Sequence, residues 1–345
     1  MRRSSTVPHP HTIQEFAFIE GLHRRFGKTG RGVVLGIGDD AALLRVSPGE
    51  DFVATTDLLV EGVHFTLTTA SYEDVGYKAA AANISDIAAM GGRPQYLLVS
   101  IAIGPAHGRS QLHGLYRGIM TACRPHGIQL VGGDTSASRR DLFLNVTLTG
   151  SVARGKALRR DGARPGDLVY VTGTLGDSLA GLCLLAKRPP RLRGGPQLVS
   201  SLIARHLRPS PRVEIGRALS TRGLATAGID LSDGLSGDLV HLCRQSRVGA
   251  EIDIEALPVS AALETYAQRL GADPADLARQ GGEDYELLFT VTPRNAARIS
   301  SLARAATCRI TRIGVIQPKS AGMRVRDRSG RLRPWKNVSY EHFRN

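Results

Sequence analysis

Seven aspartates stand in five short clusters flanked by Gly, Ser or Thr, and these are the residues best suited to chemistry. The clusters are Gly38-Asp39-Asp40, Thr55-Thr56-Asp57, Ser85-Asp86, Gly132-Gly133-Asp134 and Asp230-Leu231-Ser232-Asp233. Carboxylates crowded together repel one another, and hard divalent cations with oxygen ligands hold them ionised. Magnesium bound by carboxylates, water and phosphate oxygens is the usual use of such a set. The pattern therefore predicts a magnesium-dependent enzyme that handles phosphate groups.

Short apolar runs precede four of the five clusters, at residues 33–37, 52–54, 128–131 and 224–229. Runs of this length, bounded by Gly, Ser and Thr, are typical of buried β-strands. If each strand ends at its cluster, the strand ends bring the carboxylates to one place. We therefore expect a sheet whose strand ends form the metal site.

Helical and strand patterns alternate along the chain. Helical spacing of apolar residues predicts helices at 12–26, 72–90 and 110–126. Strands are predicted at 33–37, 41–46, 52–56, 95–103, 128–131, 142–152, 168–172 and 287–291. This mixed order predicts an α/β (α+β) fold and argues against an all-parallel sheet.

Two domains are predicted. At 345 residues the chain exceeds the size at which a single core usually stops growing. A turn-forming stretch at 163–167 precedes a restart of the strand pattern, so we place the boundary near residues 153–166. The domains are then 1–155 and 156–345, and the Pro-, Arg- and Gly-rich stretch 187–196 is an exposed loop.

Composition limits the function classes. Lys plus Arg number 45 against 31 for Asp plus Glu, a formal net charge of +14, which suits nucleic acid or anionic metabolites such as nucleotides. The arginines are scattered and there is only one Trp, which argues against nucleic acid. Four widely spaced cysteines fit reduced thiols rather than disulfides or zinc ligands. With no apolar run of membrane-spanning length and no signal peptide indicated, we expect a soluble cytoplasmic protein.

Two glycine-rich stretches invite a phosphate-loop interpretation. Residues 21–29 end in Gly27-Lys28-Thr29 but are one residue too long for the nucleotide-binding P-loop and continue a helix, so we reject them. Residues 173–178 follow a strand and open an apolar helix. Their amides either cradle a phosphate at the helix N-terminus, or form a tight turn capped by Asp177 or Ser178.

Three further features have two interpretations each. Asp230 and Asp233, three residues apart, either reach one metal–phosphate cluster or cap a helix. The acidic stretch 281–286, around Tyr285, is either a site or a turn. Trp335 lies in a polar C-terminal segment and is either a flat surface for a heterocyclic ring or a packed anchor for the tail.

Taken in order, these motifs resemble the thiamine-monophosphate kinases, a family of the aminoimidazole ribonucleotide synthetase-like ATP-binding superfamily. The matching segments cover nearly the whole chain, at 35–44, 55–65, 83–91, 131–135, 171–178, 205–212, 229–235 and 281–287. The resemblance implies that residues 1–155 bind ATP and magnesium and pair with a second copy through a β-barrel-like interface. Residues 156–345 would form an α/β half that completes the ATP and substrate site.

The resemblance further implies ATP-dependent phosphorylation of thiamine monophosphate to thiamine diphosphate, with Mg²⁺ as cofactor, in a homodimer. Magnesium would be held by Asp40, Thr55, Thr56, Asp57, Asp86, Asp134, Asp230 and Asp233. ATP would contact Tyr116, Gly133, Asp134, Arg160 and Ser232. Thiamine phosphate would contact His64, Glu283 and Trp335, and the catalytic residues would be Asp57, Asp134 and Arg160.

The chemistry of that reaction agrees with the residue types. Donor and acceptor phosphates are both anionic, so repulsion is the main barrier, and metal ions that bridge them cancel the charge and align an in-line displacement. The acceptor phosphate is already ionised, so no strong general base is needed. The alternatives are another ATP- and magnesium-dependent synthetase, of the aminoimidazole ribonucleotide or selenophosphate type, or a non-catalytic nucleotide sensor.

Overall fold

The computed structural model describes residues 21–22, 24–26, 33–35, 43–44, 47–186, 195–306 and 308–337. They fall into two compact units that interleave along the chain. The first unit comprises Met1–Ser47, Thr56–Ala80 and Gln95–Thr149, and the second comprises Pro48–Thr55, Ala81–Pro94 and Gly150–Asn345. A single boundary near residue 155 stays a prediction.

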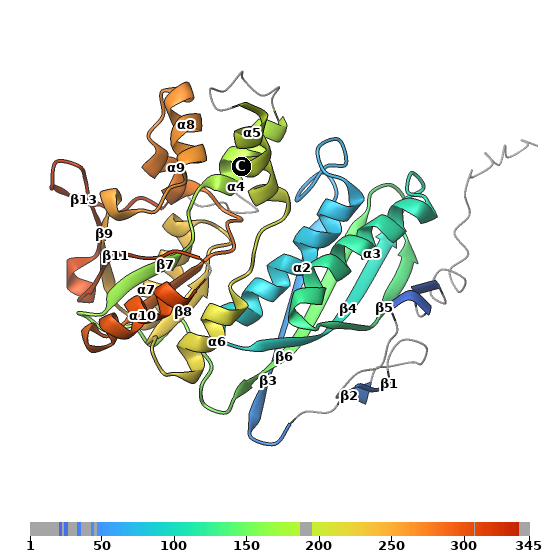
Figure 1. The fold of residues 1–345 in the computed structure, drawn as a ribbon, viewed down its shortest axis with the longest axis horizontal. Helices are drawn as coiled ribbons and strands as arrows, with labels where there is room; N and C mark the ends of the chain where they lie inside the picture. Colours follow the sequence, from blue (N-terminus) through green and yellow to red (C-terminus); the bar gives the residue numbers. More distant parts are fainter. Residues whose placement is uncertain are drawn as a thin grey trace, which may run out of the picture. The chain divides into compact units, whose positions relative to one another are not determined.

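A four-stranded sheet underlies the N-terminal half. Its order is β3-β6-β4-β5, with strands β3 (Glu50–Val60), β6 (Phe143–Ala153), β4 (Arg93–Ile103) and β5 (Gln129–Ala137). Helices α2 (Tyr72–Ala89) and α3 (Arg109–Cys123) lie side by side over one face (Figure 1). Among the described strands the sheet is open and ends at β3 and β5, so these four strands do not close into a barrel. A short antiparallel pair, β1 (Val33–Leu35) and β2 (Leu43–Leu44), precedes it.

Two glycines allow α2 and α3 to pack closely. A Cβ on Gly76 would lie 2.0 Å from the carbonyl oxygen of Leu115, and one on Gly118 would lie 1.9 Å from that of Glu73. No side chain fits at either point, so the two backbones are in direct contact. The close approach fixes both helices on the sheet that carries Asp57 and Asp134.

The second unit is built on a seven-stranded sheet. Its order is β13-β12-β9-β11-β7-β10-β8, and all pairs are antiparallel except β9 with β12. The strands are β7 (Leu168–Thr172), β8 (Ala227–Asp230), β9 (Gly249–Asp253), β10 (Leu287–Val291), β11 (Ile310–Gln317), β12 (Met323–Arg326) and β13 (Leu332–Pro334). Asp230, at the end of β8, pairs with Leu287 at the start of β10, so residues 231–234 and 281–286 meet at one end of the sheet.

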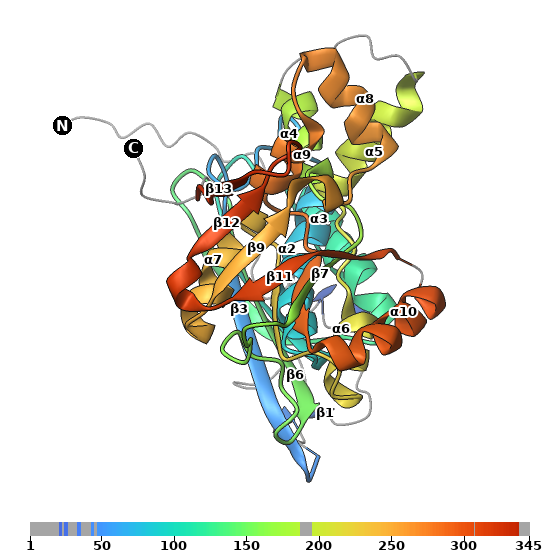
Figure 2. The same cartoon turned by 90° about the vertical axis from the view of Figure 1, so that its left-hand side faces the viewer.

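Both faces of this sheet are covered. Along β7, Val169 and Val171 face one core and Tyr170 the other, because side chains alternate across a strand. Helix α7 (Leu235–Ser246) packs on the first face, and α6 (Val213–Thr221) and α10 (Ala296–Ala305) pack on the second (Figure 2). Strands covered on both faces must be apolar at every position, and such continuous apolar runs are easily recognised as strands in the sequence.

A third cluster joins three helices beside the sheet. Helices α4 (Asp177–Ala186), α5 (Gly195–Leu207) and α8 (Ala261–Leu270) share a core that includes Leu184, Leu202 and Tyr266. Helix α9 (Pro274–Gln280) follows and leads into residues 281–286. The described 3₁₀ turns are η1 (Arg124–His126), η2 (Ile254–Ala256), η3 (Pro293–Asn295) and η4 (Lys319–Ala321).

Several predicted elements are confirmed, and one part of the sequence argument is wrong. The strands at 168–172 and 287–291 and the helix that begins at Tyr72 lie where they were predicted. The expectation that strand ends carry the aspartates holds for Asp230, at the end of β8. It fails for Asp57 and Asp134, which lie inside β3 and β5. Asp86 lies inside α2, within the helix predicted at 72–90. Gly132 and Gly133 looked like the end of a strand because Gly is favoured in turns, but both lie inside β5. The predicted helix at 12–26, except 21–22 and 24–26, and most of the loop at 187–196 lie outside the described residues.

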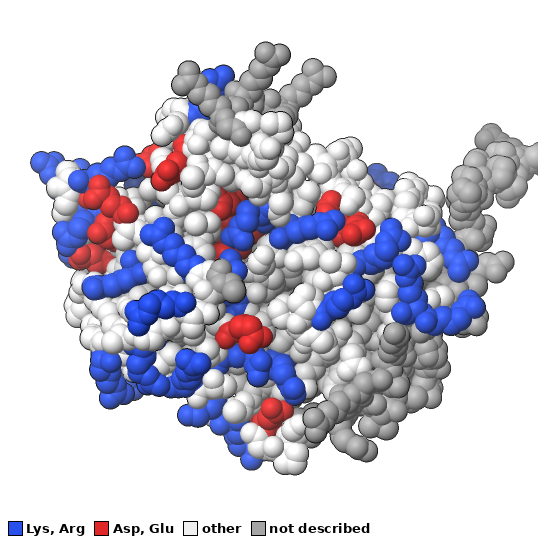
Figure 3. Space-filling model, viewed as in Figure 1, with Lys and Arg blue, Asp and Glu red and all other residues white. Residues whose placement is uncertain are grey.

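Surface charge and hydropathy agree with the compositional argument. On the face drawn in Figure 3, Lys and Arg side chains are spread over much of the surface, with uncharged stretches between them. None of the helices in the described part of the chain has the length and apolar character needed to cross a membrane.

Candidate active site

The turn between β8 and α7 carries two of the predicted metal ligands. Asp230 is buried, and the hydroxyl of Ser85 donates a hydrogen bond of 2.8 Å to its carboxylate. Gly234 has φ +99°, and a Cβ there would meet the carbonyl oxygen of Gly281 at 2.7 Å. Glycine is therefore required to bring this turn against residues 281–286.

Asp238 joins these aspartates and was missed by the sequence analysis. It lies in the first turn of α7, is 2% exposed, and accepts the backbone N–H of Asp233 at 3.1 Å. Burial, followed by the charges of Asp230 and Asp233, raises the pKa of Asp238 to about 8. An acidic residue in the first turn of a helix was a signal for it, but that pattern is common for capping alone.

Asp86 approaches the same place from α2. The hydroxyl of Thr55 donates a hydrogen bond of 2.5 Å to its carboxylate. Burial raises the pKa of Asp86, whereas the Thr55 hydrogen bond and the charge of Arg160 act in the opposite direction. Asp86 is adjacent to Ser85, which binds Asp230, so α2 and β8 are joined at this point.

Arg160 supplies the cation for this cluster. Its charge acts on both Asp86 and Asp238, so it lies within electrostatic reach of both sides. Its backbone is fixed because the hydroxyl of Ser246 donates to the Arg160 carbonyl at 2.7 Å. The second unit thus brings together Thr55, Asp86, Arg160, Asp230 and Asp233, which the sequence analysis had assigned to one site.

Residues 281–286 are held directly against the Asp230–Asp233 turn. The backbone N–H of Glu283 donates to Ser232 at 2.7 Å, and that of Tyr285 donates to Leu231 at 2.9 Å. Both Glu283 (φ +60°) and Tyr285 (φ +51°) have left-handed backbones, which non-glycine residues rarely adopt. Strained backbone of this kind clusters at functional sites, and here it brings Glu283 beside Ser232.

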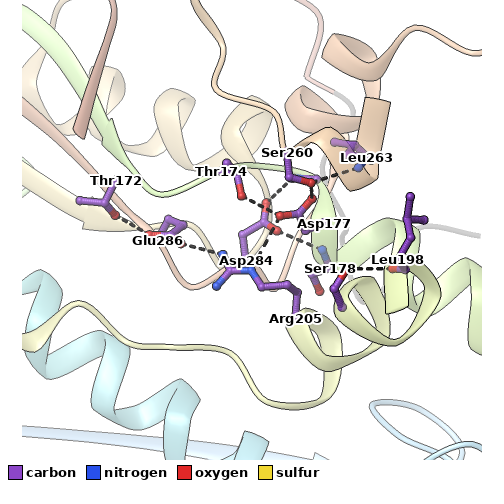
Figure 4. Close-up of polar contacts among 12 residues, drawn as sticks. Thr172, Thr174, Asp177, Ser178, Leu198, Arg205, Ser260, Leu263, Asp284 and Glu286 are labelled. Carbon is purple, nitrogen blue, oxygen red and sulfur yellow. Dashed lines mark hydrogen bonds and ion pairs between the residues drawn. The ribbon is translucent and has the colours of Figure 1, made fainter. Parts of the chain in front are cut away.

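The three acidic residues of this stretch have different roles, which the sequence could not separate. Asp284 and Glu286 are buried and point into the protein, where they bind other residues (Figure 4). The side chain of Glu283 is 35% exposed. Of the two interpretations offered for this stretch, turn and site, Asp284 and Glu286 support the turn, and Glu283 is the one of the three acidic residues whose side chain reaches solvent.

The contacts of Asp284 distinguish between the two interpretations of the glycine-rich stretch 173–178, a phosphate cradle and a tight turn. Its carboxylate accepts the N–H groups of Gly176 (2.7 Å) and Ser178 (3.2 Å) at the start of α4. Burial raises the pKa of Asp284 to about 8, and these two amides act against that shift. The N–H of Leu175 is bound by the Pro258 carbonyl. A side-chain carboxylate therefore occupies the position proposed for a phosphate, and the phosphate-cradle interpretation is wrong for these amides.

Glu286 is the centre of a buried ionic network. Arg205 Nη2 donates to its carboxylate at 2.7 Å and the Thr172 hydroxyl at 2.6 Å (Figure 4). Arg212 Nε donates to the same carboxylate at 2.6 Å. Burial alone would raise the pKa of Glu286, but Arg212, Arg205 and Thr172 outweigh it and the pKa is lowered. The network ties residues 281–286 to α5 and to the segment that follows it.

Trp335 is anchored near the start of α7. Its indole N–H donates to the carbonyl of Ser236 at 3.0 Å, and the guanidinium of Arg279 lies 5.9 Å from the ring centroid. The ring packs partly on the core and stays half-buried. Anchoring of the tail is therefore observed, and a role for the ring in binding substrate stays a prediction.

The first unit carries the other predicted ligands. On β3, the hydroxyl of Thr56 bonds with Asn145 and Thr147, and Asn145 Nδ2 donates to the backbone carbonyl of Asp57 at 3.2 Å. Asp134 is exposed on β5. The preceding Gly133 has φ +156°, and a Cβ there would lie 1.9 Å from the Val99 carbonyl. Their roles toward magnesium and ATP stay predictions, and Asp40 lies outside the described residues.

His64 and Tyr116 are more constrained than the sequence indicated. The Nδ1 atom of His64 accepts the backbone N–H of Val60 at 3.0 Å, which leaves the proton of the neutral ring on Nε2. Tyr116 is 2% exposed inside α3 and stacks on Phe26 at 6.3 Å. Burial raises its pKa well above the usual range. A contact between Tyr116 and ATP stays a prediction.

Comparison with known proteins identifies the family. Models of AIR synthase related protein match this chain, the N-terminal domain over residues 38–152 and the C-terminal domain over residues 164–325. The thiamine-monophosphate kinase of Escherichia coli K12 is 39% identical over 330 residues, which are 95% of this chain and 98% of that protein. The chain belongs to the thiamine-monophosphate kinase family.

Solved structures of the family have the same fold. The thiamine-monophosphate kinase of Stenotrophomonas maltophilia K279a superposes with a TM-score of 0.80 at 40% identity, over 90% of this chain and 96% of that one. The structure of AaThiL complexed with AMPPCP and TMP gives a TM-score of 0.76 at 34% identity, over 95% and 97% of the two chains. The mixed α/β fold and the predicted family are therefore confirmed.

Proposed function

We propose that this protein transfers the terminal phosphate of ATP to the phosphate of thiamine monophosphate and so makes thiamine diphosphate. The observation that carries the proposal is full-length similarity to thiamine-monophosphate kinases, combined with an acidic cluster that keeps an arginine beside it. A relative of the same fold was solved with AMPPCP, an ATP analogue, and TMP. The product is a diphosphate, and no covalent enzyme intermediate is required.

The carboxylates of the second unit suit magnesium. Asp86, Asp230 and Asp233 offer hard oxygen donors, and the hydroxyl of Thr55 lies beside them. No three His, Cys, Asp or Glu side chains in the described part of the chain gather as a ready-made metal site. Magnesium usually takes only one or two carboxylates per ion and completes its shell with water and phosphate oxygens, so it suits this arrangement. When bound, it would offset the charge of the two phosphates.

The chain's own residues then have distinct tasks. Arg160 adds positive charge where the transferred phosphoryl group develops negative charge. Glu283, half-exposed next to Ser232, would bind the thiamine part of the acceptor, and Trp335 would contact it in the second unit. His64 is the contact proposed for the same substrate from the first unit. Asp57 and Asp134 would hold further magnesium in the first unit. Tyr116, Gly133 and Ser232 would contact ATP.

The two buried cysteines give no support to the selenophosphate synthetase alternative. Cys123 is fully buried in α3, and burial raises its pKa to about 12. Cys243 is also buried, with its pKa raised to about 12. A thiol with so high a pKa is a poor nucleophile at neutral pH. Neither residue is suited to carry a reactive sulfur or selenium atom.

A homodimer and a cytoplasmic location are part of the same proposal. Phe52 and Leu58 on β3 are 56% and 51% exposed, and β3 is an end strand of the four-stranded sheet. Large apolar side chains exposed together on one strand favour contact with another surface. A second copy of this chain, paired through β3, would cover them, and the sedimentation velocity of the purified protein would measure its mass.

Removal of magnesium is the first test of the metal assignment. We expect turnover to fall to background with excess EDTA and to return when Mg²⁺ is added beyond the chelator, because the phosphates then lose their charge compensation. Thiamine diphosphate would be followed by chromatography. Full activity in EDTA would contradict the metal role of the aspartates.

Glu283→Gln tests the acceptor pocket. The amide keeps the shape but removes the charge, so we expect the KM for thiamine monophosphate to rise about tenfold, with the KM for ATP changing less than about twofold. Steady-state kinetics with each substrate varied in turn would measure both values. An equal rise in the two KM values would show that Glu283 does not belong to an acceptor pocket.

A further inference from the structure

His206 is a buried histidine to which neither the sequence analysis nor the proposed mechanism gives a role. It lies near the end of α5, with its side chain 8% exposed. Its Nδ1 atom is 3.1 Å from the hydroxyl of Ser178 and 3.5 Å from a carboxylate oxygen of Glu283. It therefore connects the start of α4 with Glu283, the one acidic residue of 281–286 whose side chain is partly exposed.

Two oxygens face Nδ1 of His206, the Ser178 hydroxyl at 3.1 Å and the Glu283 carboxylate at 3.5 Å. With the proton of the neutral ring on Nδ1, His206 is a donor toward both, because a hydroxyl can accept and an ionised carboxylate only accepts. In the charged form of the ring Nδ1 also carries a proton, and His206 and Glu283 then form an ion pair.

The surroundings hold His206 rigidly. Ser178 is 1% exposed, and its backbone N–H is bound by Asp284. The adjacent Arg205 is tied to the buried carboxylate of Glu286 at 2.7 Å. Since both neighbours are fixed, the imidazole has little freedom to move away from Glu283.

Glu283 depends on such a contact more than an ordinary surface glutamate would. Its backbone is fixed by the left-handed conformation and by the bond from its N–H to Ser232. A glutamate side chain nevertheless has three rotatable bonds, and ordering it costs roughly 1.5–2 kcal/mol of rotamer entropy. A buried imidazole nitrogen at 3.5 Å favours one orientation of the carboxylate before substrate arrives.

We propose that His206 is a positioning residue that orients the Glu283 carboxylate toward the thiamine part of the acceptor, and so sets specificity for that substrate. The inference rests on the proposed function. His206 does not touch ATP or the transferred phosphate in this scheme, and its effect is confined to binding of the acceptor. Pre-orientation of a binding group raises affinity because less entropy is lost on binding.

A matched pair of substitutions tests the proposal. His206→Asn places an amide N–H₂ close to the position of Nδ1, whereas His206→Gln places it close to Nε2, away from Glu283. We expect His206→Gln to raise the KM for thiamine monophosphate about tenfold, with kcat and the KM for ATP nearly unchanged. The single variant His206→Asn is expected to keep the wild-type KM for thiamine monophosphate. In the His206→Gln background, Glu283→Gln should add little further loss, because the two residues act as one unit.

The outcomes separate this proposal from the function on which it rests. No thiamine diphosphate from the wild-type protein would overturn the proposed function. Normal wild-type turnover with equal KM values in the Asn and Gln variants, or with additive losses in the double variant, would overturn only the role of His206. Ser178→Ala, which removes the second Nδ1 contact but keeps Glu283, is expected to change KM less than His206→Gln. A larger effect of Ser178→Ala would assign the role to Ser178 and contradict the proposal.

Discussion

Asp86→Asn is expected to lower kcat for thiamine diphosphate formation about a thousandfold while leaving the protein folded. Asp86 lies between the hydroxyl of Thr55 and the charge of Arg160, beside the Ser85–Asp230 hydrogen bond. Removing one carboxylate from a magnesium set costs several kcal/mol of transition-state stabilisation, and each 1.36 kcal/mol is tenfold in rate. Steady-state assay of the purified variant at saturating substrates would measure the loss.

Although Asp86→Asn should lose activity, its melting temperature should not fall. Burial raises the pKa of Asp86, which means that the folded protein disfavours its charged form. A neutral amide of equal shape relieves that cost, so the melting temperature in EDTA should stay equal or rise. Asp161→Asn is the matched control, because Asp161 pairs with Arg159 at the surface and such pairs contribute about 0–1 kcal/mol. Near-wild-type turnover in Asp86→Asn, or loss of folding, would contradict the assignment.

Glu286→Gln is expected to destabilise the folded protein by about 3–5 kcal/mol. The substitution leaves Arg205 and Arg212 with their charges largely buried and without the carboxylate that now binds both of them. Chemical denaturation followed by circular dichroism would measure the free energy of unfolding. Glu251→Gln is the control, since Glu251 binds a half-exposed arginine, Arg326, and its loss should cost about 1 kcal/mol or less.

The lowered pKa of Glu286 predicts how the difference in unfolding free energy between wild type and Glu286→Gln depends on pH. A carboxylate whose pKa is lower in the folded state stabilises the protein above its unfolded-state pKa, about 4.3 for glutamate. That contribution disappears as the pH falls through the folded-state pKa. The difference between wild type and Glu286→Gln should therefore be constant from pH 7 to about pH 5 and should shrink in more acidic buffer. A difference below about 1 kcal/mol at pH 7 would show that the network does not stabilise the fold.

The sequence predicted the layout of the site better than the contacts that maintain it. Asp230, Ser232 and Asp233 could be assigned because they follow a buried strand and precede a helix, a pattern that lies within a few residues. The roles of Asp284 and Glu286 could not be separated from that of Glu283. Their directions depend on two left-handed backbone residues, and no pattern of residue types specifies those.

Long-range pairs were beyond local sequence reasoning for the same reason. Arg205 and Arg212 were part of a recognised motif, but their partner Glu286 is 81 and 74 residues away. His206 and Glu283 are likewise far apart in the chain, and the contact of Glu286 with Arg205 is one of those that hold residues 281–286 beside α5. Asp57 and Asp134 were recognised as acidic sites but placed at strand ends, since the apolar run before Asp57 is short and the two glycines before Asp134 favour a turn.

The most direct test of the whole account is a single product assay. Purified protein would be incubated with ATP, Mg²⁺ and thiamine monophosphate, and thiamine diphosphate would be measured by chromatography, with unphosphorylated thiamine as the control acceptor. The account predicts thiamine diphosphate from the monophosphate only, and none in EDTA. Consumption of ATP without thiamine diphosphate, or equal use of unphosphorylated thiamine, would contradict it.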